Sequence, residues 1–329
     1  MEAGPFPTTP SLFFFALPAP KARSISDGTS PTARPARCST NGASAIRLLL
    51  DTYSIFFRSF YGLPAMSSGD RPTSALYGFS TLVLKLLREE QPEEVAFAVD
   101  APGPTFRHKR YPGYKDGRGP LHPDLQAQLG ELPELLSAFG FPAHRAPGFE
   151  ADDLLATLVS RTEGPALIAS GDRDLLQLVD DRVGVLFLGR RGKPPVRYDR
   201  SAVTERFGIL PHQLPSYVAF VGDPSDNLPK VPGVGPKTAT KLVAEHGSVD
   251  SILAALASLA PKLQTALRDY GDQAREVETL ARLRQDAPLE EPAFAPLRAD
   301  AIGRLSRLFE RWEMTSLLKR TADLGDGLP

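Results

Sequence analysis

Residues 165–174 read PALIASGDRD, a short apolar run that ends in an acidic turn. Apolar runs of this length between turn residues are typical of strands buried inside a sheet. Two earlier stretches have the same form, AIRLLLD at 45–51 and EEVAFAVD at 93–100, and both end in aspartate. We therefore expect three strands whose carboxyl ends carry acidic side chains.

Helical segments separate these strands along the chain. The stretch SALYGFSTLVLKLLREEQ at 74–91 has apolar residues at helical spacing. Strands that alternate with helices predict an α/β fold, with a mostly parallel sheet and helices on both faces. Beyond residue 200 the pattern is mainly helical. Further helices are expected at 125–140 and 148–162, and a fourth strand at 182–189.

Acidic residues gather where this sheet should carry its functional crevice, beyond the carboxyl ends of the strands. GFEADDLLATL (148–158) places three carboxylates where a helix begins, and VGDPSDNLP (221–229) adds two more. Carboxylates this close repel one another unless cations lie between them. The acids expected at this edge are Asp51, Asp100, Glu150, Asp152, Asp153, Asp172, Asp174, Asp223 and Asp226.

No histidine or cysteine accompanies these acids, so their oxygens are hard ligands that suit Mg²⁺, with Mn²⁺ as a substitute, rather than zinc. Two such ions stabilise the attacking and leaving oxygens in phosphoryl-type displacement. Taken singly, some acids have a structural explanation: Asp152 as a helix-start residue, Asp172 as a turn residue and Asp223 as a helix cap. The joint pattern favours a site for two Mg²⁺ ions.

Composition excludes several classes of protein. The 329-residue chain has 38 basic and 39 acidic residues, and its one cysteine is Cys38. A single cysteine excludes a disulfide framework and a cysteine-bound metal, and it suits a reducing compartment. No apolar run is long enough to cross a membrane, so no membrane partner is expected. The net charge of −1 still permits separate basic patches.

Residues 1–45 differ from the rest because they are rich in Pro, Ser, Thr, Ala and Gly. We expect a disordered tail or a start assigned too early. Four basic residues, Lys21, Arg23, Arg34 and Arg37, give this segment a faint transit-peptide character. Organellar targeting is therefore an alternative to a cytoplasmic location, which in a bacterium would be at the nucleoid.

The stretch LPKVPGVGPKTATKLVAEHGS (228–248) has two glycines around Val234 in a tight turn. Pro236 fits the first position of a helix, whose free N–H groups attract phosphate, and glycine lets a backbone approach a ligand. The pattern resembles a helix-hairpin-helix, which grips the DNA backbone; a simple αα-hairpin is the structural alternative. Candidate DNA contacts are Lys230, Gly233, Gly235, Lys237, Thr238 and Lys241, with K⁺ as a further ligand of the hairpin.

From about residue 46 to about residue 320 the chain resembles the 5′ nuclease of the flap endonuclease superfamily, in particular the 5′-3′ exonuclease domain of bacterial DNA polymerase I. The matching stretches occur in the family's order. They are LLLD with Arg58 seven residues on, YGF (77–79), AVDAPGPTFRHKRYPGYKDGR (98–118), GFEADD (148–153), ASGDRDLLQLV (169–179), GDPSDNLPKVPGVGPKTA (222–239) and FERWEMTSLL (309–318).

The resemblance implies a PIN-like or resolvase-like catalytic domain at 46–200 and a helical DNA-binding region at 201–329. It implies 5′-3′ exonuclease and flap endonuclease activity on DNA in replication or repair, with RNA primers or RNA–DNA hybrids as an alternative substrate. No polymerase segment follows residue 329, so we expect a stand-alone form that works beside a separate DNA polymerase. Nothing in the sequence suggests an oligomer, and a monomer is expected.

In the family, two Mg²⁺ ions activate water against the phosphodiester, and the single strand passes through or under an arch. The resemblance places Asp51, Asp100 and Asp152 near the first ion. It places Glu150, Asp172, Asp174 and Asp223 near the second, with Asp153 and Asp226 close by.

Residues 101–124, a long basic connection rich in Gly and Pro, correspond to the arch region. Lys115 and Arg118 match the family's basic arch positions. Arg107 and Arg58 are expected to contact phosphate, and Tyr111 and Tyr114 to stack on bases. For each of these the alternative is a solvated surface charge or a packing aromatic.

One position departs from the family pattern. Thr52 stands where the family has glycine after the first aspartate, and a β-branched residue is stiffer there. Activity is still expected because the acid set is complete. One alternative is a DNA-end or junction binder that has lost catalysis, which the complete acid set opposes. Another is a small-molecule phosphohydrolase, which the hairpin and the basic segment at 101–124 oppose.

Overall fold

The computed structural model describes residues 46–117, 119–189, 193–291 and 293–325. A six-stranded sheet lies at its centre in the order β5-β4-β1-β6-β7-β8. Every neighbouring pair is parallel except β7 with β8, so the predicted α/β fold is confirmed. The strands are β1 Arg47–Asp51, β4 Glu94–Ala98, β5 Ala143–His144, β6 Ala166–Ser170, β7 Val183–Phe187 and β8 Val196–Tyr198, while β2 Ser67–Ser68 and β3 Arg71–Pro72 form a separate pair.

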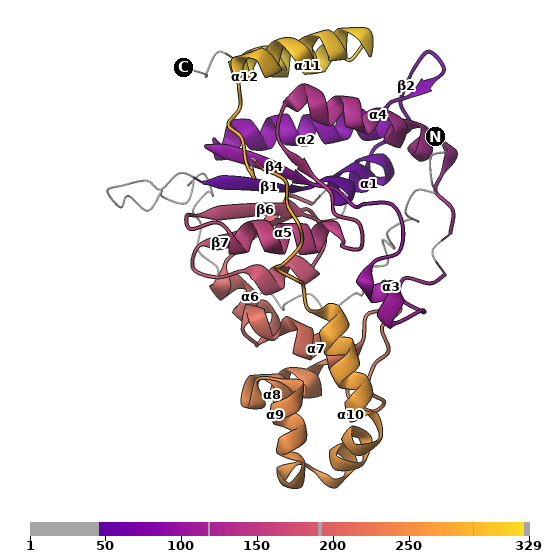
Figure 1. Ribbon diagram of the computed structural model, residues 1–329, viewed down its shortest axis with the longest axis vertical. Coiled ribbons are helices and arrows are strands. Elements are labelled where there is room, and N and C mark those ends of the chain that lie inside the picture. The colour runs from indigo at the N-terminus through magenta and orange to yellow at the C-terminus, as the bar shows by residue number, and fades with distance from the viewer. Residues whose placement is uncertain (1–45, 118, 190–192, 292, 326–329) are drawn as a thin grey trace, which may run out of the picture.

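Helices cover both faces of this sheet (Figure 1). Successive side chains of a strand point to opposite faces. Accordingly, Leu48 and Leu50 lie in one core cluster and Leu49 in the other, all three fully buried. Burying each such side chain stabilises the fold by roughly 1.5–3 kcal/mol.

The first face carries α1, α2, α4, α11 and α12, and the second carries α5 and the turns beside it. The first set is α1 Thr52–Gly62, α2 Ser74–Glu90, α4 Pro123–Phe139, α11 Ala299–Arg311 and α12 Thr315–Gly325. The second set is α5 Ala151–Ser160, the 3-10 turns η1 Asp174–Leu178 and η2 Pro211–Gln213, and α6 Arg200–Phe207. Beyond it lie α7 Leu214–Val221, α8 Pro236–His246, α9 Val249–Ala254, η3 Leu256–Ser258 and α10 Pro261–Ala281.

The core on the second face continues into the helices α7 to α10. Leu154 of α5, Phe220 of α7 and Val277 of α10 belong to one cluster of buried side chains. The helical region is therefore joined to the sheet by shared packing rather than by a linker, and it forms the lower part of the molecule in Figure 1.

The last two helices, α11 and α12, do not lie where the sequence predicted. The sequence patterns placed all of residues 201–329 in the helical region. α11 packs against α4 and α12 against α2, on the first face of the sheet. Phe309 and Trp312 are buried there. An amphipathic stripe shows that a helix is covered on one face, but it does not say which distant surface covers it.

Other differences are local. The sequence patterns assigned no helix to α1 and no strand to β5 or β8, which are too short to show an alternating pattern. The basic connection at 101–124 contains the short helix α3 Phe106–Arg110, and Thr105 and His108 form a capping box at its start. Among the described residues, no helix combines the length and the hydrophobicity that a membrane crossing requires.

Candidate functional site

Asp51 ends β1 and also caps the start of α1. Its Oδ1 accepts a hydrogen bond from the backbone N–H of Ser54 at 3.2 Å, and its Oδ2 accepts one from the Ser170 hydroxyl at 2.5 Å. Burial raises the pKa of Asp51 to about 7, and the charges of Asp100 and Asp172 add to the rise. The carboxyl is therefore poised to lose its proton when positive charge arrives.

The neighbouring acids act on one another in the same way. Burial, and then the charge of Asp172, raises the pKa values of Asp152 and Asp174 well above their usual range. Asp100, just beyond β4, accepts a hydrogen bond from the Ala151 N–H at 2.8 Å and so joins the strand end to the start of α5. The acids coupled across this edge are Asp51, Asp100, Glu150, Asp152, Asp172, Asp174, Asp223 and Asp226. We call these residues the acid edge.

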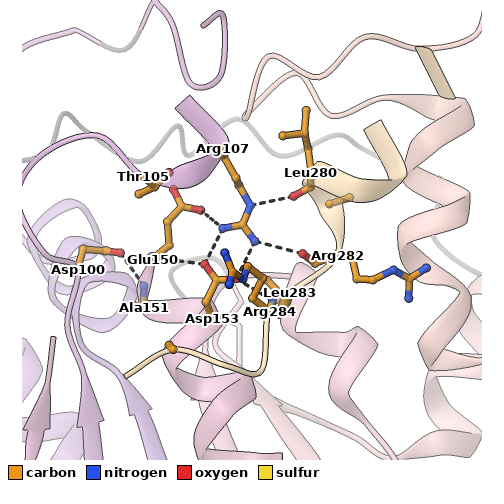
Figure 2. Close-up of polar contacts among 12 residues, drawn as sticks. Asp100, Thr105, Arg107, Glu150, Ala151, Asp153, Leu280, Arg282, Leu283 and Arg284 are labelled. Atoms are coloured by element: carbon orange, nitrogen blue, oxygen red, sulfur yellow. Dashed lines mark hydrogen bonds and ion pairs between the residues drawn. The ribbon is translucent and has the colours of Figure 1, made fainter. Parts of the chain in front are cut away.

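Asp153 was predicted among these acids, but the structure places it elsewhere. Its side chain is fully buried, and both of its oxygens accept hydrogen bonds from Arg107, at 2.7 and 2.8 Å (Figure 2). Arg107 was expected to contact phosphate, yet it is 2% exposed and also bonds Glu150. Arg107 and Asp153 pair with each other inside the protein, so neither charged group is exposed to a ligand.

Tyr114 also differs from its predicted role in stacking on bases, because the side chain is 3% exposed. Its hydroxyl lies 2.9 Å from Glu150 and 2.7 Å from Asp226, and it links the α5 start to the 221–229 loop. Burial, together with these two carboxylates, raises the pKa of Tyr114 well above its usual range. The hydroxyl is therefore a hydrogen-bond donor at any physiological pH.

Lys115 lies at the acid edge. Its ammonium is 2.7 Å from Oε1 of Glu150 and 3.9 Å from Oδ2 of Asp226. Although burial opposes it, the cations of Lys115 and Arg107 lower the pKa of Glu150 to about 2. Glu150 is thus a carboxylate throughout the usable pH range, unlike Asp51.

The remaining predicted contacts are less defined. Arg58 of α1 is half-buried, donates from Nε to the Gly189 carbonyl at 2.9 Å, and has a pKa lowered by burial. Tyr111 is half-buried and packs against the core of the second face. Arg118 lies outside the described residues.

The acid edge suits a divalent cation by the chemistry of its donors, which are carboxylate oxygens in mutual electrostatic contact. Among the described residues, no group of three or more His, Cys, Asp or Glu side chains is arranged to hold a metal ion as it stands. Asp152 and Asp174 are half-exposed, so their carboxylates are accessible to an incoming cation.

The predicted hairpin lies between α7 and α8. Gly233 has a φ of +79°, a left-handed conformation that favours glycine, and Gly235 caps α8, which begins at Pro236. The lysines predicted to contact DNA are on the surface, whereas Thr238 is half-buried. The exposed lysines are Lys230, Lys237 and Lys241.

Some residues of the site were not predicted from the sequence. The Ser170 hydroxyl bonds Asp51 and also accepts from the Asp172 N–H at 2.9 Å, while Ser54 accepts from the Gly171 N–H at 2.8 Å. A serine directly before Gly-Asp is the available signal, because serine hydroxyls often stabilise turns. Lys262 of α10 is a further exposed lysine; its Cε lies 3.9 Å from where a Cβ on Gly233 would be.

Comparison with known proteins shows which family this chain resembles. Residues 47–208 match the family described as 5′-3′ exonuclease, N-terminal resolvase-like domain, and residues 209–300 match 5′-3′ exonuclease, C-terminal SAM fold. DNA polymerase I of Mycobacterium tuberculosis (strain ATCC 25618 / H37Rv) is 39% identical over 292 residues, which are 87% of this chain and 32% of the relative. The thermostable DNA polymerase I of Thermus aquaticus is 38% identical over 277 residues, 82% of this chain and 32% of the relative. The chain thus spans about a third of the length of these relatives.

Solved structures share the fold. The bacteriophage T5 flap endonuclease, in a pseudo-enzyme-product complex with DNA and metal ions, has a TM-score of 0.59 at 18% identity, covering 85% of this chain and 99% of that one. The catalytic core of Rad2, in complex with DNA substrate, has a TM-score of 0.58 at 17% identity, covering 89% of this chain and 95% of that one.

Proposed function

This chain belongs to the 5′-3′ exonuclease family, and on that premise we propose that it is a structure-specific nuclease that hydrolyses DNA phosphodiesters at a 5′ end or 5′ flap. The observation that carries the proposal is the acid edge, where coupled carboxylates meet the ammonium of Lys115. Phosphodiester hydrolysis needs both charges: carboxylates to hold cations, and a cation to receive the phosphate.

The acid edge would hold two Mg²⁺ ions, with Mn²⁺ able to substitute. Divalent ions bound there would lower the pKa of water and offset the charge of the phosphate. We assign Asp51, Asp100 and Asp152 to one ion; to the other we assign Glu150, Asp172, Asp174 and Asp223, with Asp226 close by. The T5 flap endonuclease, which shares this fold, is described in a complex with DNA and metal ions, and this supports metal binding at the acid edge.

The chain's own residues orient this site. Ser170 holds Asp51 and the turn that carries Asp172, so two ligands from different strands keep a fixed relation. We assign to Lys115 the role of neutralising the scissile phosphate, and we extend that role to Arg118. We propose that Arg58, whose Nε donates to the Gly189 carbonyl, contacts phosphate from α1, with Tyr111 as a further DNA contact.

The helical region would grip the duplex. Exposed lysines beside the backbone amides of the Gly233–Gly235 turn can bind phosphates regardless of base sequence, and K⁺ is a further candidate ligand of this turn. The residues proposed for this grip are Lys230, Gly233, Gly235, Lys237, Thr238, Lys241 and Lys262.

We further propose that the protein acts as a monomer in the cytoplasm, in replication or repair beside a DNA polymerase. The relatives support a role in DNA synthesis or repair, since they carry the name DNA polymerase I. RNA–DNA hybrids are proposed as a second substrate, because RNA and DNA both have phosphate backbones and the proposed contacts are to phosphate.

Cleavage of an end-labelled 5′-flap duplex tests the proposal. Cutting near the junction with Mg²⁺, its loss with EDTA, and its loss in an Asp172→Ala variant are the expected results. The same flap made of RNA measures the second substrate. A protein that shifts the duplex on a gel but leaves it whole in both Mg²⁺ and Mn²⁺ would be a junction binder instead.

A further inference from the structure

Arg107 joins three segments that lie far apart in the sequence (Figure 2). It belongs to α3, in the basic connection at 101–124. Its Nε donates to the carbonyl of Leu280 at 2.8 Å, at the carboxyl end of α10. Its two terminal nitrogens bond Asp153 and Glu150, at the amino end of α5.

Every N–H of this guanidinium is used. A guanidinium has five N–H donors in a planar fork. One bonds Leu280, three bond the carboxylates of Glu150 and Asp153, and the last faces the Arg282 carbonyl at 3.4 Å. Helix dipoles favour the arrangement, because a cation lies at the carboxyl end of α10 and carboxylates lie at the amino end of α5.

A second set of contacts joins the end of α10 to the start of α5. The backbone N–H of Arg284 donates to Oδ1 of Asp153 at 2.9 Å, directly linking the chain after α10 to α5. The Arg284 guanidinium lies over the rings of Phe106 and Phe149, with centroids at 5.1 and 4.7 Å. Asp153 also accepts from the N–H of Glu150 at 3.1 Å. Asp153 therefore contacts both Glu150 and the segment that follows α10.

We propose that Arg107 is a positioning residue that locks the end of α10 to the start of α5, and so sets the distance between the duplex grip and the acid edge. α10 packs against α7, which leads into the glycine turn and α8. The start of α5 carries Glu150 and Asp152. The proposal rests on the proposed nuclease function, because that distance decides which phosphodiester reaches the acid edge.

The planar fork is what the lock requires. Lysine keeps the positive charge but has three donors on a point-like ammonium and does not match two carboxylates and two carbonyls at once. Arg107→Lys therefore removes the geometry and keeps the charge. Arg110→Lys is the matched control. Arg110 is on the same helix and bonds Glu276 of α10 at 2.8 Å, but its side chain is 50% exposed and, among the described residues, it forms no ion pair with α5.

Hydrogen exchange of the metal-free 329-residue chain tests the lock without using activity. In Arg107→Lys, the amides of Glu150 and Arg284 should exchange together, about tenfold faster or more, although Arg107 bonds neither amide. The amides of β6 should keep their wild-type rates, and Arg110→Lys should leave the Glu150 and Arg284 amides unchanged. Faster exchange confined to α3, or an equal rise at all amides including β6, would overturn the proposal.

Cleavage position provides the second readout. On a 5′-flap duplex with Mg²⁺, Arg107→Lys should spread the products over neighbouring phosphodiesters, while its duplex Kd in Ca²⁺ stays within about twofold of the wild type. A slower reaction at the unchanged position would mean that Arg107 does not set the distance. If the wild-type protein cuts nothing, the proposed function fails, and the exchange experiment still decides whether the lock exists.

Discussion

The ammonium of Lys115 lies 2.7 Å from Oε1 of Glu150, which holds a basic residue of the 101–124 connection against the acid edge. Lys115 has a φ of +55°, a left-handed conformation that is uncommon for residues other than glycine. Its backbone N–H donates to the Asp226 carbonyl at 3.0 Å, so the main chain and the side chain are both fixed. The pairing stabilises an unfavourable backbone conformation at the position where positive charge is needed.

Lys115→Met should destabilise the protein in a pH-dependent way. The pKa of Glu150 is about 2 in the folded protein against an ordinary 4.5, so its ionisation stabilises the fold above pH 4.5, and that contribution is lost as pH falls toward 2. Without Lys115 the folded pKa rises, and we expect a loss of about 1–3 kcal/mol at pH 7. Urea unfolding at pH 7, 5 and 3 measures this. The difference between variant and wild type should shrink as the pH falls; a constant difference would show that Glu150 is not the cause.

The contribution of Asp51 to stability should depend on pH in the opposite direction. Its pKa is raised to about 7, so the folded state binds the proton more tightly than the unfolded state does. Its contribution to stability is therefore full below pH 3.8 and is lost as pH rises through 7. Added Mg²⁺ should offset this loss, and the rise in Tm that it causes should be larger at pH 8 than at pH 6. Asp51→Asn should reduce that difference, and an equal Mg²⁺ effect at both pH values would count against cation binding at Asp51.

Asp172→Ala should abolish cutting and leave duplex binding intact. The residue follows β6, and its charge acts on Asp51, Asp152 and Asp174. We expect the rate to fall by about 10²–10³ or more, the range seen when a group that stabilises developing charge is removed. Single-turnover cleavage and Kd in Ca²⁺ measure the two effects separately. Undiminished turnover would remove Asp172 from the site.

Lys237→Ala should weaken duplex binding on all sequences and lower the slope of log Kd against log salt by about 1, because one phosphate contact is lost. Lys237 is exposed in the first turn of α8. Lys319→Ala is the matched control, since Lys319 is also exposed but lies on α12, on the first face of the sheet. Equal slopes for both variants would mean that the hairpin does not touch phosphate.

Thr52→Val should stabilise the protein by about 1 kcal/mol. The Thr52 hydroxyl is fully buried and has no hydrogen-bond partner among the described residues, and an unsatisfied buried hydroxyl carries a desolvation penalty. Valine has the same branched shape without the polar atom. The urea midpoint should rise with an unchanged m-value. A lower midpoint would show that the hydroxyl is satisfied in solution, and cleavage by this variant would test whether Thr52 affects the site.

The local sequence patterns predicted the strands and the type of fold better than they predicted which distant segments pack together. The strands ending at Asp51, near Asp100 and before Asp172 could be located because buried strands of a parallel sheet form apolar runs closed by a turn. Their shared edge followed from the direction of the strands. The position of α11 and α12 did not follow, because an apolar stripe does not identify its partner.

The sequence by itself determined that acidic residues gather at the carboxyl edge of a parallel sheet, because strand direction and side-chain type are local properties. The tertiary structure alone decided that Asp153, Arg107 and Tyr114 turn inward, where Arg107 pairs with Asp153 and the Tyr114 hydroxyl bonds Glu150 and Asp226. The Arg107 guanidinium bonds the Leu280 carbonyl across 173 positions of sequence. A charged side chain can be buried only where distant segments supply its partners, and that supply depends on how the whole chain packs.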